Sequence, residues 1–368
     1  DFTSLKNRKV MIKPNAGRFV GPRLGINTSP EAVAGVLDFF LEHGVVNLCV
    51  AESPILGVRA LDALEKCGIS AVARERGIPL VDLDAEKPVT VNIPNARAVN
   101  SLKVCRKVLE TDFIVSVAVM KMHMHTQVSL GLKNMKGCLF LREKVRLHQL
   151  PPIPDLKPPA KPLDLAIADM AKILMPDLCV IDGSIGLEGL GPSAGNPRPL
   201  GAAVASFNTL GADFTAARLM GLDPAEIHHL QLARGALASL KDSPWASPEN
   251  YRVYPEDFAR HAQTFERPPE KLSFRFDNVR VEDVESCSAC LSTVMMFLKR
   301  YEQDLADYYT PEEPLRLALG KGIGPQKEGT ILVGNCAGCR AKGCVFIRGC
   351  PPVASDILKA VQEQKKNT

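Results

Sequence analysis

The residues best suited to chemistry in this sequence are six cysteines near its C-terminal end. They are Cys287, Cys290, Cys336, Cys339, Cys344 and Cys350. Two Cys-x-x-Cys pairs occur among them, and this spacing lets both sulfurs of a pair point at one centre. Glycine and proline lie beside the cysteines, and glycine lets backbone N–H groups approach an anionic sulfur. Thiolates grouped in this way are typical ligands of a soft metal ion or an iron–sulfur cluster.

Disulfides and structural zinc are the competing interpretations. The chain holds 11 cysteines, an odd number, and the other five lie singly in apolar segments, as buried free thiols do. No hydrophobic leader is visible, so we expect a reducing compartment, which argues against disulfides. In a zinc ribbon about 15–20 residues separate the two pairs, whereas here the longer segment 291–335 lies between them. A cubane cluster needs four cysteines, so some of the six are not expected to ligate.

Composition indicates an ordinary globular protein that is long enough for two domains. The chain has 368 residues, of which 46% are hydrophobic, and a net charge of +4. It has no basic run with interleaved aromatic residues, so nucleic-acid binding is not expected. No apolar run approaches the roughly 18 residues of a membrane span. We expect a cytoplasmic protein, and an exposed cluster would further suggest an oxygen-poor niche.

Strands and helices alternate along most of the chain. Apolar runs predict strands at 9–15, 45–51, 78–83, 112–118, 177–182 and 202–206. Helical patterns lie between and after them, at about 30–43, 58–67, 71–76, 163–174, 210–220 and 224–233. The glycine-rich segment 183–195 is predicted to be a loop, and the proline-rich segment 150–162 a surface connector or lid. This order predicts an α/β fold, with a mainly parallel sheet covered by helices on both faces.

The alternation breaks down between residues 246 and 270, where we place a domain boundary. We expect an α/β domain over residues 1–250 and a small cysteine-rich α+β domain over 271–368. Within the second domain, the sequence predicts strands at 272–276, 315–319 and 330–333 and helices at about 291–301 and 351–361. The positive N-terminal end of the last helix would face the sulfurs.

Polar residues follow several of the predicted strands. Ligands bind at the carboxyl ends of strands in open α/β sheets, so we expect these residues to share one edge, the strand-end rim. Its members are Lys13, Asn15, Glu52, Ser53, Lys121, His123, Lys133, Asn134 and Lys136. Lysines gathered there would bind a carboxylate or phosphate. The alternatives are solvated lysines and asparagines that only close turns.

Three rim features leave more than one interpretation open. His123 could be a metal ligand, a general acid or base, or a histidine held by hydrogen bonds at a strand end. His125 lies two residues on and would face the same side of an extended strand, so the two could share a metal. Glu52 could act as a base or pair with a lysine. The loop Gly186–Gly195 could wrap an anion, although it lacks the order of known phosphate loops.

The pattern Lys121-x-His123 followed by Lys133-Asn134-x-x-Gly137 resembles the family known only as domain of unknown function 362. The resemblance covers roughly residues 9–235 and does not include His125 or the proline-rich segment. Its other matching positions are Lys13-Pro14-Asn15, Glu52-Ser53, Asp182, Glu188, Gly191-Pro192 and Asp213. Members of that family often carry cysteine clusters and are described as iron–sulfur proteins, but the family has no assigned activity.

The tail also resembles cluster-binding segments that read Gly-x-Cys and then Gly-Cys-Pro-Pro after an upstream Cys-x-x-Cys. This resemblance implies that a [4Fe–4S] cluster is held by Cys287, Cys290, Cys336 and Cys350. Cys339 and Cys344 would then be spare or alternative ligands. If all six ligate, a larger or double cluster follows.

We therefore predict an iron–sulfur enzyme, an oxidoreductase or lyase, that acts on a small anionic substrate. The catalytic candidates are Lys133, His123, Lys121 and Glu52, and the substrate-binding candidates are Lys13, Asn15, Asn134, Gly191 and Asp182. The cluster would relay electrons or act as a Lewis acid. Two other classes stay open: a non-catalytic electron carrier that docks through the rim, and a hydrolase or lyase with structural zinc. A redox partner protein and a homodimer are compatible with the prediction, and no membrane partner is expected.

Overall fold

The computed structural model describes residues 2–157, 159–239, 251–268, 277–340 and 343–366. The chain divides into two compact units. The first comprises Asp1–Gly189 and Gly195–Arg267, and the second comprises Leu190–Ala194 and Pro268–Thr368. Among the described residues, no helix is both long and apolar enough to cross a membrane.

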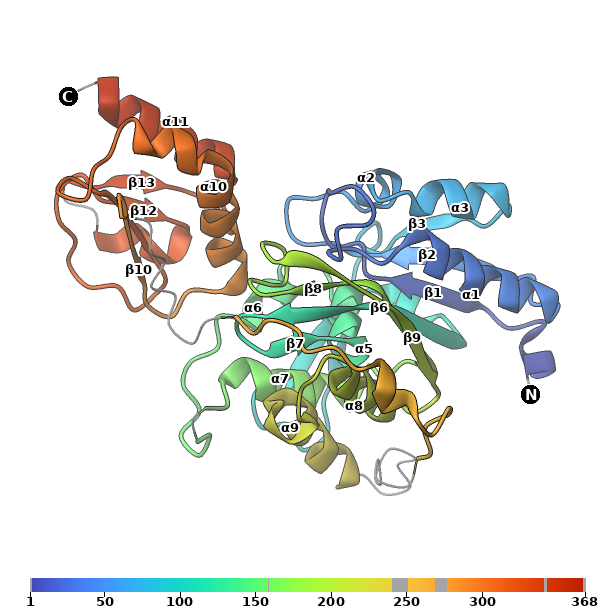
Figure 1. Ribbon diagram of the computed structural model, residues 1–368. Helices are drawn as coiled ribbons and strands as arrows, with labels where there is room; N and C mark the ends of the chain where they lie inside the picture. Colours follow the sequence, from blue (N-terminus) through green and yellow to red (C-terminus); the bar gives the residue numbers. More distant parts are fainter. Residues whose placement is uncertain (1, 158, 240–250, 269–276, 341–342, 367–368) are drawn as a thin grey trace. The chain divides into compact units, whose positions relative to one another are not determined.

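A mainly parallel sheet forms the centre of the first unit (Figure 1). Its strands are β1 (Val10–Pro14), β2 (Leu48–Glu52), β3 (Leu80–Asp82), β6 (Phe113–His123), β7 (Gln127–Ser129), β8 (Leu178–Glu188) and β9 (Asn196–Ser206). They pair in the order β3-β2-β1-β6-β8-β9, with β7 attached to the end of β6. Only β7 and β9 run antiparallel to their neighbours. The α/β fold predicted from alternating strands and helices is confirmed.

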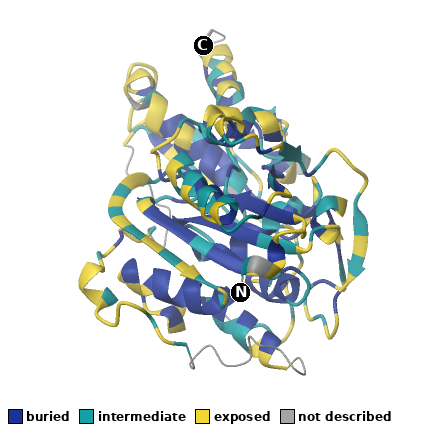
Figure 2. Cartoon of the chain, turned by 90° about the vertical axis from the view of Figure 1, so that its right-hand side faces the viewer, coloured by how far each residue is buried: buried dark blue, intermediate teal, exposed yellow. Residues whose placement is uncertain are grey.

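Helices cover both faces of this sheet, because residues along a strand alternate between its two faces. On one face, Val10 and Ile12 of β1 contribute to a core with α1 (Pro30–Glu42), α2 (Ala60–Lys66) and α3 (Ile69–Glu75). On the other face, Met11 contributes to a larger core. That core includes residues of α5 (Gly131–Asn134), α7 (Pro162–Ala171), α8 (Thr209–Leu219) and α9 (His228–Ala238). The strands between these layers are largely buried (Figure 2).

Local signals explain where α1 begins and ends. The hydroxyl of Ser29 accepts the N–H of Ala32, and Pro30 occupies the first helical position, where its missing N–H costs nothing. Gly44 follows the helix with a φ of 75°, a left-handed conformation that glycine adopts without strain. The predicted Ser-Pro start and glycine stop of this helix are both confirmed.

Three strands, β6, β8 and β9, are longer than predicted, and β9 begins at Asn196 rather than at residue 202. β6 continues beyond residue 118 to His123. β8 continues through the segment from Gly183 to Glu188, which was predicted to be part of a glycine-rich loop. That segment pairs with the antiparallel β9, and a register shift between Gly183 and Ile185 accommodates the irregularity. The loop prediction was therefore wrong over 183–188, because cross-strand pairing satisfies the backbone despite the glycines.

Several short elements carried too little periodicity to be predicted. A two-stranded antiparallel sheet forms from β4 (Val89–Asn92) and β5 (Ser101–Val104). The remaining short helices of this unit are η1 (Phe2–Leu5), α4 (Arg106–Leu109), η2 (Met135–Cys138), α6 (Glu143–Arg146), η3 (Pro224–Glu226) and η5 (Phe258–His261). The strand predicted at 272–276 lies outside the described residues.

The second unit contains a parallel four-stranded sheet in the order β10-β11-β12-β13. Its elements are β10 (Val279–Asp283), α10 (Ser288–Ala306), β11 (Leu315–Leu319), β12 (Ile331–Val333), η6 (Asn335–Arg340), β13 (Val345–Ile347) and α11 (Ala354–Lys366). The two helices pack against each other. The predicted helix near 291–301 begins earlier, at Ser288, so Cys290 lies in its first turn.

Candidate functional site

The strand order places a topological switch point between β1 and β6. From β1 the chain moves outward to β2 and β3, whereas β6 pairs on the other side of β1 and is followed by β8. Helix-covered parallel sheets bind ligands beyond the carboxyl ends of the strands at such a point. Lys13 at the end of β1 and Lys121 and His123 at the end of β6 therefore stand where a ligand is expected.

A buried ion pair lies beneath this edge. The Nζ atom of Lys13 is 2.8 Å from Oε1 of Glu52, and both residues are almost fully buried. The other carboxylate oxygen of Glu52 accepts the N–H of Ala16 at 2.7 Å, and Oε1 also accepts the N–H of Ser53 at 2.9 Å. Both carboxylate oxygens of Glu52 thus already accept hydrogen bonds. The geometry therefore favours the interpretation that Glu52 pairs with a lysine over the interpretation that it acts as a base.

Gly137 lets the chain pass close to this ion pair. A Cβ atom at this position would lie 2.5 Å from Nζ of Lys13 and 2.6 Å from Oε1 of Glu52. Any other residue would push the pair apart. This close approach is a physical reason for a glycine at the end of the Lys133-Asn134-x-x-Gly137 pattern.

Asn134 and Asn15 connect the ion pair to Lys121. The Oδ1 atom of Asn134 accepts from Nζ of Lys13 at 3.3 Å and from Nδ2 of Asn15 at 3.2 Å. Oδ1 of Asn15 in turn accepts from Nζ of Lys121 at 2.6 Å. Nδ2 of Asn134 donates to the carbonyl of Lys13 and to the hydroxyl of Ser116. The two asparagines thus position two lysines rather than simply closing turns.

Lys121 is buried without a carboxylate partner in the described part of the chain. Its Nζ atom donates to Asn15 and to the carbonyl of Ile26, both neutral acceptors. Burial, together with the neighbouring positive charge of Arg18, lowers the pKa of Lys121 to about 7, while Glu52 acts in the opposite direction. Lys121 can therefore gain or lose a proton near neutral pH.

Lys133 is the second buried lysine that lacks a carboxylate at ion-pairing distance among the described residues. Its Nζ atom lies 2.7 Å from Oγ1 of Thr126 and 3.3 Å from Oγ of Ser129. Burial holds the pKa of Lys133 well below its ordinary value, and the charges of Lys136 and Lys121 add to this effect. Lys133 is therefore biased towards the neutral amine.

Asp213 on α8 fixes the backbone at the start of α5, the short helix that carries Lys133. Its carboxylate accepts the N–H groups of Gly131 at 2.7 Å and of Leu132 at 3.0 Å, at the start of α5. Burial raises the pKa of Asp213 to about 7, although these two hydrogen bonds oppose the shift. A Cβ atom on Gly131 would collide with Sγ of Cys179. The turn that carries Lys133 therefore requires both the glycine and the aspartate.

A small cavity of about 30 Å³ lies among these groups. It is lined by Asn15, Lys121, Ser129, Lys133 and Asn134, together with apolar residues of β6 and Leu130. A single water molecule needs a cavity of roughly 10–15 Å³, so this cavity accepts about two water-sized groups. We call it the lysine pocket. The structure brings five sequence-predicted rim residues together around one space: Lys13 behind it, and Asn15, Lys121, Lys133 and Asn134 on its walls.

His123 lies beside the lysine pocket but is committed to a turn. Its Nδ1 atom accepts the N–H groups of His125 at 3.1 Å and of Thr126 at 3.3 Å, which closes the connection from β6 to β7. Burial lowers the pKa of His123 far below its ordinary value, and Lys133 adds to this effect. The histidine is neutral at physiological pH, and only Nε2 can carry its proton.

Further buried basic groups surround Lys133. Burial lowers the pKa of His125 to about 3, and its Nε2 atom has no hydrogen-bond partner among the described residues. Nζ of Lys136 lies 2.6 Å from Nε2 of His148. Nδ1 of His229 is 4.0 Å from a carboxylate oxygen of Asp164. Sequence reasoning did not identify His148, His229 or Asp164, because no motif surrounds them.

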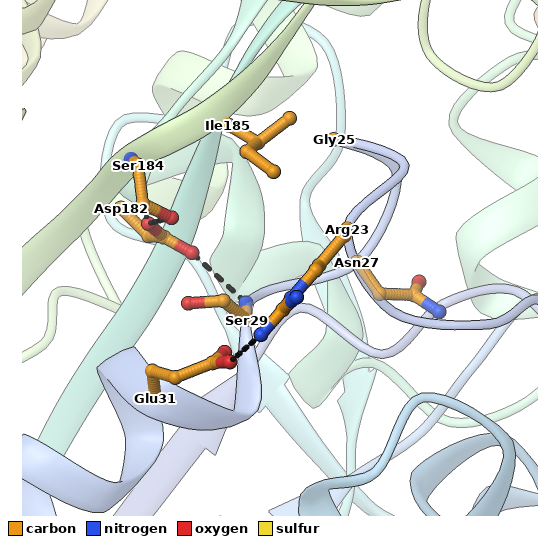
Figure 3. Close-up of a pocket in the computed structure, with 8 residues that line it drawn as sticks. All are labelled: Arg23, Gly25, Asn27, Ser29, Glu31, Asp182, Ser184 and Ile185. Atoms are coloured by element: carbon orange, nitrogen blue, oxygen red, sulfur yellow. Dashed lines mark hydrogen bonds and ion pairs between the residues drawn. The ribbon is translucent and has the colours of Figure 1, made fainter. Parts of the chain in front are cut away.

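Asp182 and Gly191 do not line the lysine pocket. The carboxylate of Asp182 accepts the N–H of Ser29 at 2.8 Å and that of Ser184 at 2.9 Å, so it anchors the start of α1 to β8. It lines a separate cavity of about 170 Å³, in which Arg23 points towards Glu31 (Figure 3). Gly191 belongs to the segment Leu190–Ala194, which is part of the second unit.

In the second unit, three chain segments bring four cysteines together. Cys287 and Cys290 flank the first turn of α10, Cys336 lies in η6, and Cys350 follows β13. A hydrogen bond with Cys287 raises the pKa of the Cys290 thiol, as do burial and the nearby Cys350 and Cys336. The four residues implied as ligands by the resemblance of the tail are thus neighbours.

Backbone hydrogen bonds hold these segments against one another. The N–H of Asn335 donates to the carbonyl of Gly349 at 2.9 Å, and the N–H of Gly349 donates to Oδ1 of Asn335 at 2.8 Å. Gly334 lies against the sulfur of Cys290, since a Cβ atom there would be 2.7 Å from Sγ. The Cys336 and Cys350 segments are therefore fixed as one unit beside Cys290.

The other two cysteines of the tail are Cys344 and Cys339. Sγ of Cys344 lies 3.5 Å from the carbonyl of Lys327, and the side chain of Cys339 is outside the described residues. Among the side chains that are described, no three histidine, cysteine, aspartate or glutamate residues are placed so that they could hold a metal ion. The described part of the chain thus shows four neighbouring thiols without a closed site of three or more ligands.

The sheet topology and the lysine pocket define an α/β protein with a ligand site at its switch point. Residues 10–218 match the model of the family described as "Domain of unknown function (DUF362)". The chain belongs to this family, as its motifs predicted. The family description assigns no activity.

Two further proteins are similar to this chain. A thylakoid-associated protein of Synechocystis sp. is 27% identical over 219 residues, which cover 60% of this chain and 65% of that protein. The match therefore spans less than two thirds of the relative's length. The lactate racemase apoprotein from Thermoanaerobacterium thermosaccharolyticum aligns with 14% identity and a TM-score of 0.37, covering 63% of this chain and 50% of that one. This structural likeness is too distant to carry an argument.

Proposed function

We propose that this protein is an iron–sulfur enzyme, of the oxidoreductase or lyase type, that acts on a small anionic substrate. The observation that carries the proposal is the grouping of Cys287, Cys336 and Cys350 around the buried thiol of Cys290. Four cysteines are the ligand number of a [4Fe–4S] cluster. The lysine pocket supplies a separate site at which a substrate anion would bind.

The chemistry of the four cysteines fits such a cluster. Neighbouring thiols and burial keep the Cys290 thiol protonated, because a thiolate there would face other sulfurs in a medium of low polarity. A metal centre reverses this balance, since its positive charge stabilises several thiolates at once. Cys287 and Cys290 also stand at the N-terminal end of the 19-residue helix α10, whose dipole favours anionic sulfur.

The lysine pocket fits a small anion. Lys121 and Lys133 lack carboxylate partners among the described residues, whereas Lys13 close by is paired with Glu52. Buried cationic groups are normally paired, so a lysine that can be charged, Lys121, on a cavity without a carboxylate partner among the described residues supports an anion as the ligand. A carboxylate or phosphate oxygen would accept from Nζ of Lys121 and draw a proton onto it.

The protein's own residues supply binding, orientation and proton transfer. Lys121 would hold the substrate anion, and its pKa of about 7 lets it bind or release a proton as the anion enters and leaves. Asn15 and Asn134 orient Lys121 and limit its movement. A bound cluster would supply electron transfer or, at an iron without a cysteine ligand, a Lewis acid. A redox partner protein would deliver electrons in the first case.

Metal analysis tests the first half of this proposal. The protein purified without oxygen should contain about four irons and four sulfides and give an EPR signal after reduction with dithionite. Cys290→Ser and Cys350→Ser should lose most of the iron, whereas Cys67→Ser, a buried thiol of the first unit, should keep it. Zinc without sulfide would refute the iron–sulfur proposal and favour the structural-zinc alternative. Near eight irons would implicate all six tail cysteines.

Ligand binding tests the second half. Oxamate, a small carboxylate, should bind the wild-type protein and bind at least about tenfold more weakly to Lys121→Met, because loss of one charged hydrogen bond costs about 1.5–3 kcal/mol. The exposed Lys103→Met is the matched control and should bind like the wild type. Unchanged binding in Lys121→Met would show that the lysine pocket is not the anion site and would favour a carrier that docks through its surface.

A further inference from the structure

Three lysines meet at the strand-end rim, and each has a different set of partners. Lys13 pairs with the carboxylate of Glu52. Lys121 donates to two carbonyl-type oxygens, on Asn15 and Ile26, which can only accept. Lys133 contacts two hydroxyl groups, on Thr126 and Ser129. Hydroxyls both donate and accept, so the partners of Lys133 can satisfy the lone pair of an uncharged amine as well as its N–H groups.

The two hydroxyls differ in what they can offer Lys133. The hydroxyl of Thr126 donates to the carbonyl of Val128 at 3.1 Å, so towards Lys133 it acts as an acceptor at 2.7 Å. Ser129 is farther away, at 3.3 Å, and its hydroxyl can donate to the nitrogen lone pair. A neutral amine can therefore satisfy its donor and acceptor positions in this place. The longer contact with Ser129 is the one that a substrate would replace.

The surroundings of Lys133 disfavour its charged form. Lys133 is 7% exposed, and the charges of Lys136 and Lys121 add to the effect of burial, with Asp164 opposing them more weakly. Burial beside other cations is the setting in which enzymes keep a lysine nucleophilic. Asp213 and Gly131 fix the backbone of the short helix that carries it. The amine is thus biased towards its neutral form, held in place and in contact with a cavity.

The lysine pocket presents two different groups to a ligand. Lys121 is the anion-binding group, and Lys133 is the nucleophile, and both line the same cavity with Ser129. The cavity of about 30 Å³ limits the ligand to a small one. We propose that Lys133 forms an imine with the carbonyl carbon of a small 2-oxo acid whose carboxylate is held by Lys121. This inference rests on the proposed function of the lysine pocket as a small-anion site.

The step balances without an external reagent. The nitrogen of Lys133 bonds to the carbonyl carbon, the electron pair of the C=O bond moves to oxygen, and one proton passes from that nitrogen to the oxygen, which gives a carbinolamine. The C–O bond of the carbinolamine then breaks as the nitrogen lone pair forms the C=N bond, and the leaving oxygen takes a proton from the hydroxyl of Ser129 to become water. Ser129 regains a proton when the protonated imine releases one. The products are one imine and one water. The protonated imine withdraws electrons from the neighbouring carbon, which eases cleavage of a bond there.

Borohydride trapping tests this inference. The full-length protein, purified without oxygen, is incubated with pyruvate or glyoxylate, reduced with sodium borohydride, digested and mapped by mass spectrometry. We expect a single reduced adduct, located on Lys133 and absent when the keto acid is omitted. Lys133→Arg should lose the label, and Lys103→Arg, a change at an exposed lysine, should keep it. Oxamate, which has no ketone, should protect Lys133 from labelling.

The outcomes separate this inference from the proposed function. Iron, sulfide and oxamate binding at wild-type levels with no adduct on Lys133 would overturn the imine and leave the small-anion site in place. Labelling spread over exposed lysines would overturn it in the same way. The peptide map of the wild-type protein decides the question even if Lys133→Arg does not fold. A failure of oxamate to bind would instead remove the anion site on which the inference rests.

Discussion

Lys13 and Glu52 form a buried ion pair across the adjacent strands β1 and β2, with 2.8 Å between Nζ and Oε1. Both side chains are withdrawn from water, so each charge depends on the other. Around this pair the backbone N–H groups of Ala16 and Ser53 turn towards the carboxylate. The pair anchors the strand-end rim, and Asn134 connects it to the lysine pocket.

Breaking this pair should destabilise the first unit strongly. Glu52→Leu leaves the Lys13 charge buried without a partner and should lower the free energy of unfolding by about 3–5 kcal/mol. The double variant Lys13→Met with Glu52→Leu should recover part of the loss. Urea unfolding followed by circular dichroism measures both. Arg23→Ala disrupts the exposed pair with Glu31 and should change little; an equal effect of the two changes would contradict the role given to Lys13 and Glu52.

Anion binding should depend on pH through Lys121. The ammonium form binds the anion, and the pKa of about 7 means that this form is lost as pH rises through 7. The affinity for oxamate should therefore be highest below pH 7 and fall by up to about tenfold per pH unit above it. Isothermal titration calorimetry in two buffers of different ionisation enthalpy should show proton uptake at pH 8. Lys121→Met should abolish both the uptake and the pH dependence.

Asp213 should make the stability of the fold depend on pH in the opposite way from most carboxylates. Its pKa is raised to about 7 in the folded state, so the folded state holds the proton more tightly than the unfolded state. The stabilisation is complete below about pH 4 and is lost as pH rises through 7, by at most about 1.4 kcal/mol per pH unit.

Asp213→Asn should remove this pH dependence, because asparagine keeps an acceptor for the start of α5 without a titrating group. Urea unfolding at a series of pH values between 4 and 8 measures the difference between the two curves. The exposed Asp155→Asn should give a curve parallel to that of the wild type. Parallel curves for Asp213→Asn as well would show that Asp213 does not titrate in this range.

A methyl group at position 334 should reduce the iron content. Gly334 has a φ of 92°, and a Cβ there would lie 2.7 Å from the sulfur of Cys290. Gly334→Ala therefore combines backbone strain with displacement of a proposed ligand. Gly329 has a similar φ of 78° but open space around its Cβ position, so Gly329→Ala provides the strain alone. Iron and sulfide assays should show a loss in the first variant only.

The strand ends of the rim were predictable because each is marked by a polar residue after an apolar run. Lys13, Glu52 and Lys121 follow buried strands directly, and parallel strands bring their ends together. Sequence periodicity could not show which lysine would be paired, since Lys13 and Glu52 are far apart in the chain. The division of roles among the three lysines depends on contacts that only the folded chain creates.

The hydroxyls beside Lys133 illustrate why the sequence analysis did not identify the other contacts of the lysine pocket. Thr126 and Ser129 lie on the short turn and strand after β6, where three residues of β7 are too few for a periodic signal. Asp213 matched the family pattern. Its hydrogen bond with the N–H of Gly131, however, joins α8 to α5, and a contact between residues so far apart in the chain cannot be predicted from local sequence. In the second unit, the resemblance of the tail to cluster-binding segments singled out Cys287, Cys290, Cys336 and Cys350, and the last two lie near Cys290 in the fold.

The outer strand β9 has a consequence for the behaviour of the protein in concentrated solution. It is 11 residues long and pairs only with β8 among the described strands, and an open edge of this length is a template for aggregation. Pro197 and Pro199 lack the N–H that an incoming strand would need. Gly201, with a φ of 72°, coincides with the register shift opposite β8, and such bulges twist an edge away from partners. The chain thereby discourages uncontrolled sheet extension between molecules.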